Sequence, residues 1–192
     1  MILAVSLFLL FIASFLLQEM MPALIALIDA GTGGGGGAFL HHARALFLPA
    51  FFFAAVLAVP FPVMLLLAFC SGMAWDAANA LIWTETSPGF GGGPILFGML
   101  GIVMHGSRDL FVRGKWVLPI LLGGACVFVL LLAEYFWINF RAGDFHFPAG
   151  FWIKTIMSSL MTTILLPAYF LVIHRCLRSE GMAGEFRQFG PR

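Results

Sequence analysis

The 192-residue chain is 61% hydrophobic and only 10% charged, with a formal net charge of +1 at pH 7. A soluble domain is roughly 45–50% apolar and about 25% charged, so this composition excludes an ordinary water-soluble fold, and the small net charge indicates no nucleic-acid partner. Long apolar runs in place of short alternating strands predict an all-α membrane protein, with a single polytopic domain over residues 1–192 in the lipid bilayer.

The first third of the chain predicts one crossing and a linker. A hydrocarbon core about 30 Å thick needs about 20 helical residues to cross it. The first apolar run predicts a helix over residues 2–18 that ends at Gln18 and Glu19. A shorter apolar piece at 20–28 is expected to be an interfacial or capping segment and not a second crossing, because it contains Pro22 and is followed by Asp29. The stretch 31–37 is almost all glycine and is predicted to be a flexible linker.

The following run is too long for one straight helix and short for two. No Asp, Glu, Lys or Arg occurs in residues 45–75, and Pro60 and Pro62 lie in the middle. Because proline restricts the residue before it to extended conformations, we predict a short helix at 45–59 and a longer one at 62–83. The short helix either crosses at reduced length or dips into the bilayer and returns.

Three further helices complete a predicted bundle of about six transmembrane helices. A glycine-rich loop at 84–94 precedes the first of them, and they are expected at 95–111, 116–139 and 151–174. A polar tail at 175–192 follows.

Lysine and arginine fall unevenly on the two sides of this bundle. One side carries Arg108, Arg113, Lys115, Arg175, Arg178, Arg187 and Arg192. The other carries Arg44, Arg141 and Lys154. By the positive-inside rule the tail is expected in the cytoplasm, and an even number of crossings places the N-terminus there too.

Asp76 is the clearest ionisable residue inside a predicted span. Gly72 and Ala68 lie four and eight residues before it, so the three residues form a stripe on one helix face that lets another helix approach closely. A structural interpretation has Asp76 bonded to a donor such as His105 or a backbone amide. A functional interpretation makes it a proton- or ligand-binding carboxylate. On the structural interpretation, Gly72→Leu disrupts folding or partner binding.

Three other ionisable residues are candidates for polar contacts within the bundle. His105, with Arg108 one turn further on, could form a cluster with Asp76. Glu134 lies near the aromatic end of the 116–139 helix, where its side chain can reach the headgroup region.

Arrangements typical of catalysis are missing from the sequence, and we expect a protein that is not an enzyme and has no cofactor. The side chains of the adjacent His41 and His42 diverge, and Cys70, Cys126 and Cys176 have no metal-ligand spacing, so no metal site is expected either.

The order of these features resembles that of the rod shape-determining protein MreD family of the bacterial inner membrane. The resemblance is carried by Phe15-Leu-Leu-Gln18, Leu48-Pro49-Ala-Phe, Phe69-Cys-Ser-Gly72-Met-Ala-Trp-Asp76, the run from Phe97-Gly-Met-Leu-Gly101 to Arg108 and Arg113, and Pro167-Ala-Tyr-Phe through His174-Arg175 and Arg178. Two features depart from the family: the linker at 31–37 lengthens the first connection, and Ala68 stands where a glycine is frequent.

The resemblance implies a non-catalytic scaffold of the cell-shape and cell-wall elongation machinery. Such a protein binds a single-span MreC-type partner and takes part in peptidoglycan synthesis with MreB filaments, RodA and penicillin-binding protein 2. The family's fold is similar to the substrate-binding subunits of energy-coupling-factor transporters, so the alternative is a small-molecule-binding membrane subunit of a transporter. That alternative needs a polar pocket on the outer face.

Overall fold

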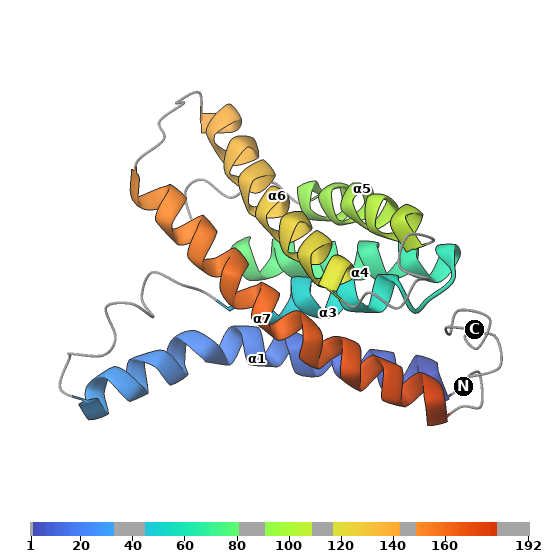
Figure 1. The fold of residues 1–192 in the computed structure, drawn as a ribbon. Helices are drawn as coiled ribbons and strands as arrows, with labels where there is room; N and C mark the ends of the chain where they lie inside the picture. Colours follow the sequence, from blue (N-terminus) through green and yellow to red (C-terminus); the bar gives the residue numbers. More distant parts are fainter. Residues whose placement is uncertain (1, 33–44, 81–90, 109–116, 143–148, 180–192) are drawn as a thin grey trace.

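The computed structural model of the chain describes residues 2–32, 45–80, 91–108, 117–142 and 149–179. In this part of the chain all regular structure is helical and there is no strand, which confirms the predicted all-α class (Figure 1). The helices are α1 (Ile2–Thr32), α3 (Phe47–Val56), α4 (Phe61–Ala80), α5 (Gly92–Gly106), α6 (Val117–Ala142) and α7 (Ala149–Ser179).

Three of the helices are long and apolar enough to cross a membrane. The apolar spans are Phe61–Asn79 in α4, Val117–Phe140 in α6 and Gly150–Ile173 in α7. The apolar stretches of α1, α3 and α5 are shorter, from 10 to 17 residues. The count of six crossings therefore stays a prediction, whereas three candidate spans indicate a membrane location.

The outside of the bundle is apolar and part of its inside is polar. Exposed side chains on the long helices are large and hydrophobic, for example Phe8 on α1 (63% exposed), Leu66 on α4 (67%) and Ile164 on α7 (74%). Buried polar residues include Ser14, Gln18, Ser71, Asp76, Asn79, Thr155, Ser158, Ser159 and Thr162. This distribution is typical of a helical protein whose solvent is lipid.

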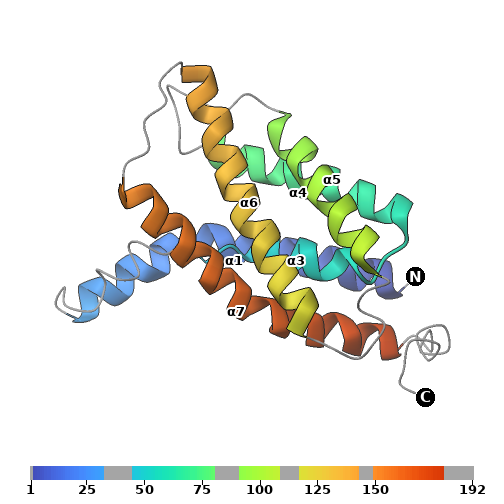
Figure 2. The same cartoon turned by 45° about the horizontal axis from the view of Figure 1, so that its top comes forward.

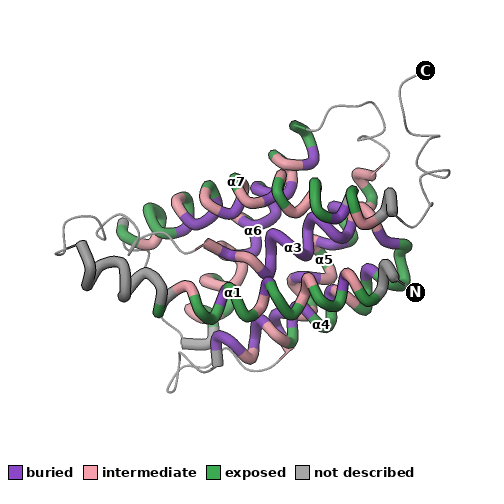
Figure 3. Tube along the Cα trace, turned by 90° about the horizontal axis from the view of Figure 1, so that it is seen from below, coloured by how far each residue is buried: buried purple, intermediate pink, exposed green. Residues whose placement is uncertain are grey.

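The short helix α3 forms the centre of the bundle and contacts each of the other five described helices. Its residues from Leu48 to Val56 are all buried, as the continuous purple of α3 in Figure 3 shows. Ten helical residues rise only about 15 Å, half of the hydrocarbon core, so α3 is too short to cross the core.

The helical structure is interrupted between α3 and α4, at the position that Pro60 and Pro62 predicted. The last turn of α3 closes with a hydrogen bond of 2.9 Å from Ala58 N–H to Ala55 O, and α4 starts directly after Pro60. The carbonyl of Pro60 accepts the N–H of Met64 at 3.0 Å, and Pro62 lies in the first turn of α4. Because a proline in the first turn gives up no helical hydrogen bond, α4 accommodates Pro62 there.

The predicted end of the first helix at Gln18 and Glu19 is wrong. Helix α1 continues to Thr32, so the segment at 20–28 is not a separate interfacial piece. Gln18 is buried against α3, and its polar side chain is used there without ending α1. Glu19 is exposed on the next position of the helix surface. Gln18 thus marked a contact with a neighbouring helix and not a helix end.

The structure also differs from the prediction at two boundaries, the start of the linker and the start of the polar tail. The first two residues of the linker at 31–37 belong to α1, and the rest of the linker lies outside the described residues. Helix α7 ends at Ser179, so the predicted tail at 175–192 begins on the last turns of a helix. The start of α1 and the ends of α5 and α7 lie at the same end of the bundle (Figures 1 and 2).

Candidate functional site

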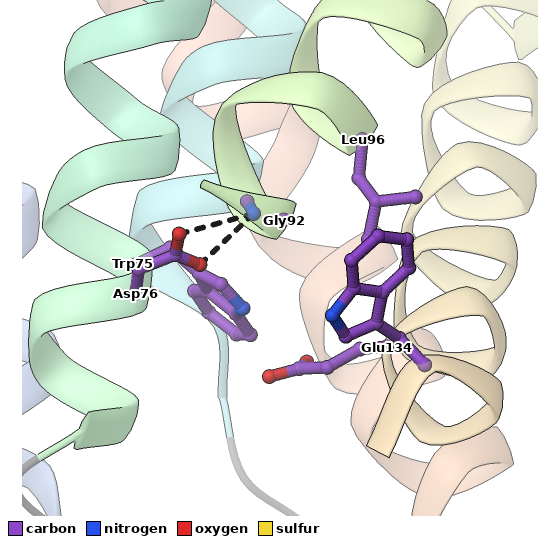
Figure 4. A pocket seen from close by; sticks show the side chains of 7 residues that line it. Trp75, Asp76, Gly92, Leu96 and Glu134 are labelled. Atoms are coloured by element: carbon purple, nitrogen blue, oxygen red, sulfur yellow. Dashed lines mark hydrogen bonds between the residues drawn. The ribbon is translucent and has the colours of Figure 1, made fainter. Parts of the chain in front are cut away.

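The carboxylate of Asp76, on α4, caps the N-terminus of α5. Its Oδ2 accepts a hydrogen bond of 2.8 Å from the N–H of Gly91, and the N–H of Gly93 donates to Oδ1 and Oδ2 at 2.9 and 3.2 Å (Figure 4). The first N–H groups of a helix have no partner inside it, and the helix dipole favours negative charge beside them. Asp76 is only 7% exposed, so the cap satisfies buried groups on both sides. Gly91 has a φ of 117°, which a residue with a side chain rarely adopts.

Small residues allow α4 and α5 to pack closely at this cap. Ala68, Gly72 and Asp76 are all buried on α4. A side-chain carbon on Gly72 would collide with the backbone of Gly93 and Pro94. A side-chain carbon on Gly93 would lie 2.9 Å from Cγ of Asp76. The stripe predicted from the sequence therefore serves an interface, and the helix that occupies it is α5 of the same chain.

A small, half-open pocket adjoins the cap between α4, α5 and α6 (Figure 4). It is lined by Trp75, Asp76, Gly92, Gly93, Leu96, Glu134 and Trp137. It has room for about one water molecule. The side chain of Glu134 extends from α6 toward α4, and its Oε1 accepts a hydrogen bond of 2.6 Å from Nδ2 of Asn79. The pocket thus brings together two candidates from the sequence, Asp76 and Glu134.

Two indole rings form walls of the pocket. Trp137, on α6, lies over Gly92, where an added side-chain carbon would be 3.5 Å from the indole Nε1. Trp75 packs against Phe97 with ring centroids 6.2 Å apart, and Phe97 packs against Phe52 of α3 at 5.1 Å. The pocket wall is therefore held by the aromatic core that surrounds α3.

His105 and Arg108 lie at the other end of α5 from Asp76. The Nδ1 of His105 is 3.2 Å from the carbonyl oxygen of Val56, at the C-terminus of α3, and its ring packs on Phe61 at 5.8 Å. Arg108 is half-buried just beyond the end of α5. Of the two partners expected for Asp76, the structure has the backbone amides, and it does not form the cluster of Asp76 with His105.

The cap on the N-terminus of α3 was missed from the sequence. The N–H of Leu48 donates to Oε1 of Gln18 on α1 at 3.1 Å, and the N–H of Leu46 donates to Oγ1 of Thr162 on α7 at 3.2 Å. Thr162 also donates to the carbonyl of Ser158 at 2.7 Å. The only signal in the sequence was the presence of polar residues inside apolar runs.

The pocket also contains residues that the sequence did not single out. The glycines from Gly91 to Gly93 fell in a predicted loop at 84–94, yet α5 begins at Gly92. Trp137 lies at the aromatic end of the helix predicted at 116–139, where tryptophan is typical of the membrane interface. A helix start was signalled only by Pro94, which suits a first helical turn.

In the described residues no group of three or more His, Cys, Asp or Glu is placed to hold a metal ion. Comparisons of the chain with protein-family models, curated proteins and solved structures found no match.

Proposed function

We propose that this chain is a non-catalytic membrane scaffold that binds a single-span helix of a partner protein in the bilayer. The resemblance to the MreD family makes that partner an MreC-type protein and the setting the cell-wall elongation machinery of a bacterial inner membrane.

The observation that carries the proposal is the distribution of polarity. The long helices expose large apolar side chains, and the buried Gln18, Asp76 and Thr162 are hydrogen-bonded within the chain. Such an exterior offers lipid and other membrane helices a surface for packing. Both oxygens of Asp76 accept backbone N–H groups, which supports its structural interpretation over a role as a proton carrier.

The stripe of Ala68, Gly72 and Asp76 is covered by α5, so a partner needs another surface. The outer face of α5 is the best candidate, because side-chain carbons added at Gly98 or Gly106 would meet no atom within 4 Å. The residues between them, Ile102 and Val103, are exposed. Small residues next to exposed apolar ones allow a second helix to come close.

The orientation in this proposal places the Arg108 and Arg175 end in the cytoplasm. Both lie at the end of the bundle where α1 begins, so the start of α1 and the end of α7 share that side. This agrees with the positive-inside rule as applied to the sequence.

The proposal is tested by a pull-down from detergent-solubilised membranes with a C-terminally tagged copy at native expression level. We expect recovery of a single-span MreC-type protein, and rounding of the cells on depletion. Gly98→Leu is expected to reduce recovery, whereas Gly98→Ala leaves it unchanged. Recovery of an ATPase pair with a coupling subunit would contradict the scaffold and favour the transporter alternative. The pocket beside Asp76 is too small for a vitamin, so the transporter alternative needs another site.

A further inference from the structure

Helix α1 carries an ionisable side chain on the side that faces away from the bundle. Glu19 is exposed there, and Ile12, Leu16 and Met20, which share its side of the helix, are exposed and apolar. Figure 3 shows such exposed positions as the green parts of α1. Glu19 is the only charged side chain in residues 1–28 of the sequence. These four residues form the outer face of α1.

Two hydrogen bonds indicate how deep Glu19 lies in the bilayer. Thr162 lies at the centre of the 24-residue apolar span of α7, and it accepts the N–H of Leu46 at 3.2 Å. The N–H of Leu48, in the same first turn of α3, donates to Gln18 at 3.1 Å. Glu19 follows Gln18, so it lies about 1.5 Å further along the axis of α1 and about 100° around it. Its carboxyl group therefore leaves α1 near the middle of the membrane.

A carboxyl group at this depth needs a partner. The headgroups are about 15 Å away, half of the hydrocarbon core, and a glutamate side chain is too short to reach them. The charged form is costly in lipid, and the protonated form still has an O–H donor to satisfy. Ionisable residues inside a membrane almost always face the bundle interior, a water-filled cavity or one another. Among the described residues, however, none forms a hydrogen bond or an ion pair with Glu19.

Charge and depth together select the partner. A phospholipid carries its positive charge at the headgroup and supplies none at the centre of the bilayer. A second copy related by two-fold symmetry would place Glu19 against Glu19, and these like charges repel. The described basic side chains Arg108, Lys154 and Arg175 lie near the ends of their helices, so they too are at the wrong depth. A transmembrane helix of another protein can carry a basic residue in the middle of its span.

We propose that the outer face of α1 binds a transmembrane helix of another protein, through an ion pair between Glu19 and an arginine or lysine in the middle of that helix. Opposite charges attract strongly there because the dielectric constant is low. Ile12, Leu16 and Met20 provide the apolar contacts on both sides of the pair. This face belongs to a different helix from Gly98, and the inference does not rest on the scaffold function.

The first test uses synthetic helices in phosphatidylcholine vesicles that contain the full chain. One oligoleucine peptide has an arginine at its centre, and the control peptide has leucine there. Energy transfer between labelled peptide and labelled protein measures binding. We expect the arginine peptide to bind the wild type about tenfold more tightly than the leucine peptide. Glu19→Gln is expected to abolish this difference, and Glu19→Asp, which keeps the charge, is expected to preserve most of it. Thermal unfolding of the variants checks that they fold.

The second test identifies the natural occupant. A photo-crosslinking amino acid is placed at Leu16 on the outer face of α1 or, as the control, at the exposed Leu66 on α4, and illuminated in native membranes. Peptide mass spectrometry identifies the product. From Leu16 we expect a segment of another membrane protein with an arginine or lysine in the middle of its apolar span. Glu19→Gln is expected to lower the yield about tenfold, and Leu66 is expected not to give this product.

Four results would overturn the proposal: equal binding of the two peptides to the wild type, a product made of two copies of this chain, a product whose span has no basic residue, or no protein product at Leu16. A pull-down that recovers no single-span MreC-type protein would contradict the scaffold function, whereas the peptide binding and its dependence on Glu19 would stand unchanged.

Discussion

The backbone N–H of Gly93 on α5 donates to both carboxylate oxygens of Asp76 on α4, at 2.9 and 3.2 Å. The bond joins the end of one helix to the start of the next through a buried charge. It fixes the position at which α5 begins and the distance at which the two helices pack. The pocket beside it is lined by residues of these two helices and of α6.

Removing the carboxylate of Asp76 should destabilise the fold. Asp76→Ala leaves the half-buried Gly91 and the buried Gly93 without an acceptor for their N–H groups, which costs about 1–3 kcal/mol. Asp76→Asn keeps one oxygen acceptor and is expected to lose less. Thermal unfolding in detergent measures both. An Asp76→Ala variant that unfolds at the wild-type temperature would show that the cap contributes nothing.

Two glycines on facing helices should respond in opposite ways to the same substitution. Gly72→Ala pushes a side chain into the backbone at Pro94, and overpacking of this kind typically costs about 1–3 kcal/mol. Gly98→Ala adds the same methyl group where no atom lies within 4 Å, and its better helix propensity stabilises by up to about 1 kcal/mol. Unfolding of both variants in the same detergent checks the pair. Equal effects would mean that α4 does not face α5 at Gly72.

Much of the fold could be predicted from the sequence, because the lengths of apolar runs and the prolines act locally. Pro60 restricts its neighbours whatever surrounds it, so the break between α3 and α4 was predictable. The path of α1 was not, because the partner of Gln18 is the N–H of Leu48, 30 residues away. A polar residue that is satisfied by a distant helix looks, in the sequence, like the end of a span.

The sequence likewise predicted some residues of the candidate site but not their partners. Asp76 stood out because an ionisable residue inside a membrane span needs a partner, and Gly72 stood out by its spacing. The partner of Asp76 could not be predicted, because it depends on which helix end packs beside it in the tertiary structure. Glu134 was predicted at a lipid headgroup, whereas it faces the same pocket as Asp76.

The cap on α3 predicts a second buried position that is sensitive to substitution. Gln18→Leu keeps the size of the side chain but removes the acceptor of the Leu48 N–H, so we expect a loss of about 1–3 kcal/mol. Its neighbour Leu17 is 47% exposed, and Leu17→Ala is expected to stay within about 0.5 kcal/mol of the wild type. Stability in a denaturant series compares the two variants. A Gln18→Leu variant as stable as Leu17→Ala would contradict the cap.

The apolar exterior predicts how a reagent dissolved in lipid will label the chain. An apolar carbene precursor, activated by light in the bilayer, reacts with whatever it touches. We expect labelling at Leu66 and Ile164, which are 67% and 74% exposed, because their helix faces lie in lipid. The buried residues from Phe51 to Phe53 of α3 are expected to stay unlabelled. Peptide mass spectrometry reads the pattern, and unfolding in detergent before illumination provides the control, in which α3 becomes labelled. Labelling of α3 equal to that of α7 in the intact membrane would place the short helix at the lipid surface and contradict its position at the centre of the bundle.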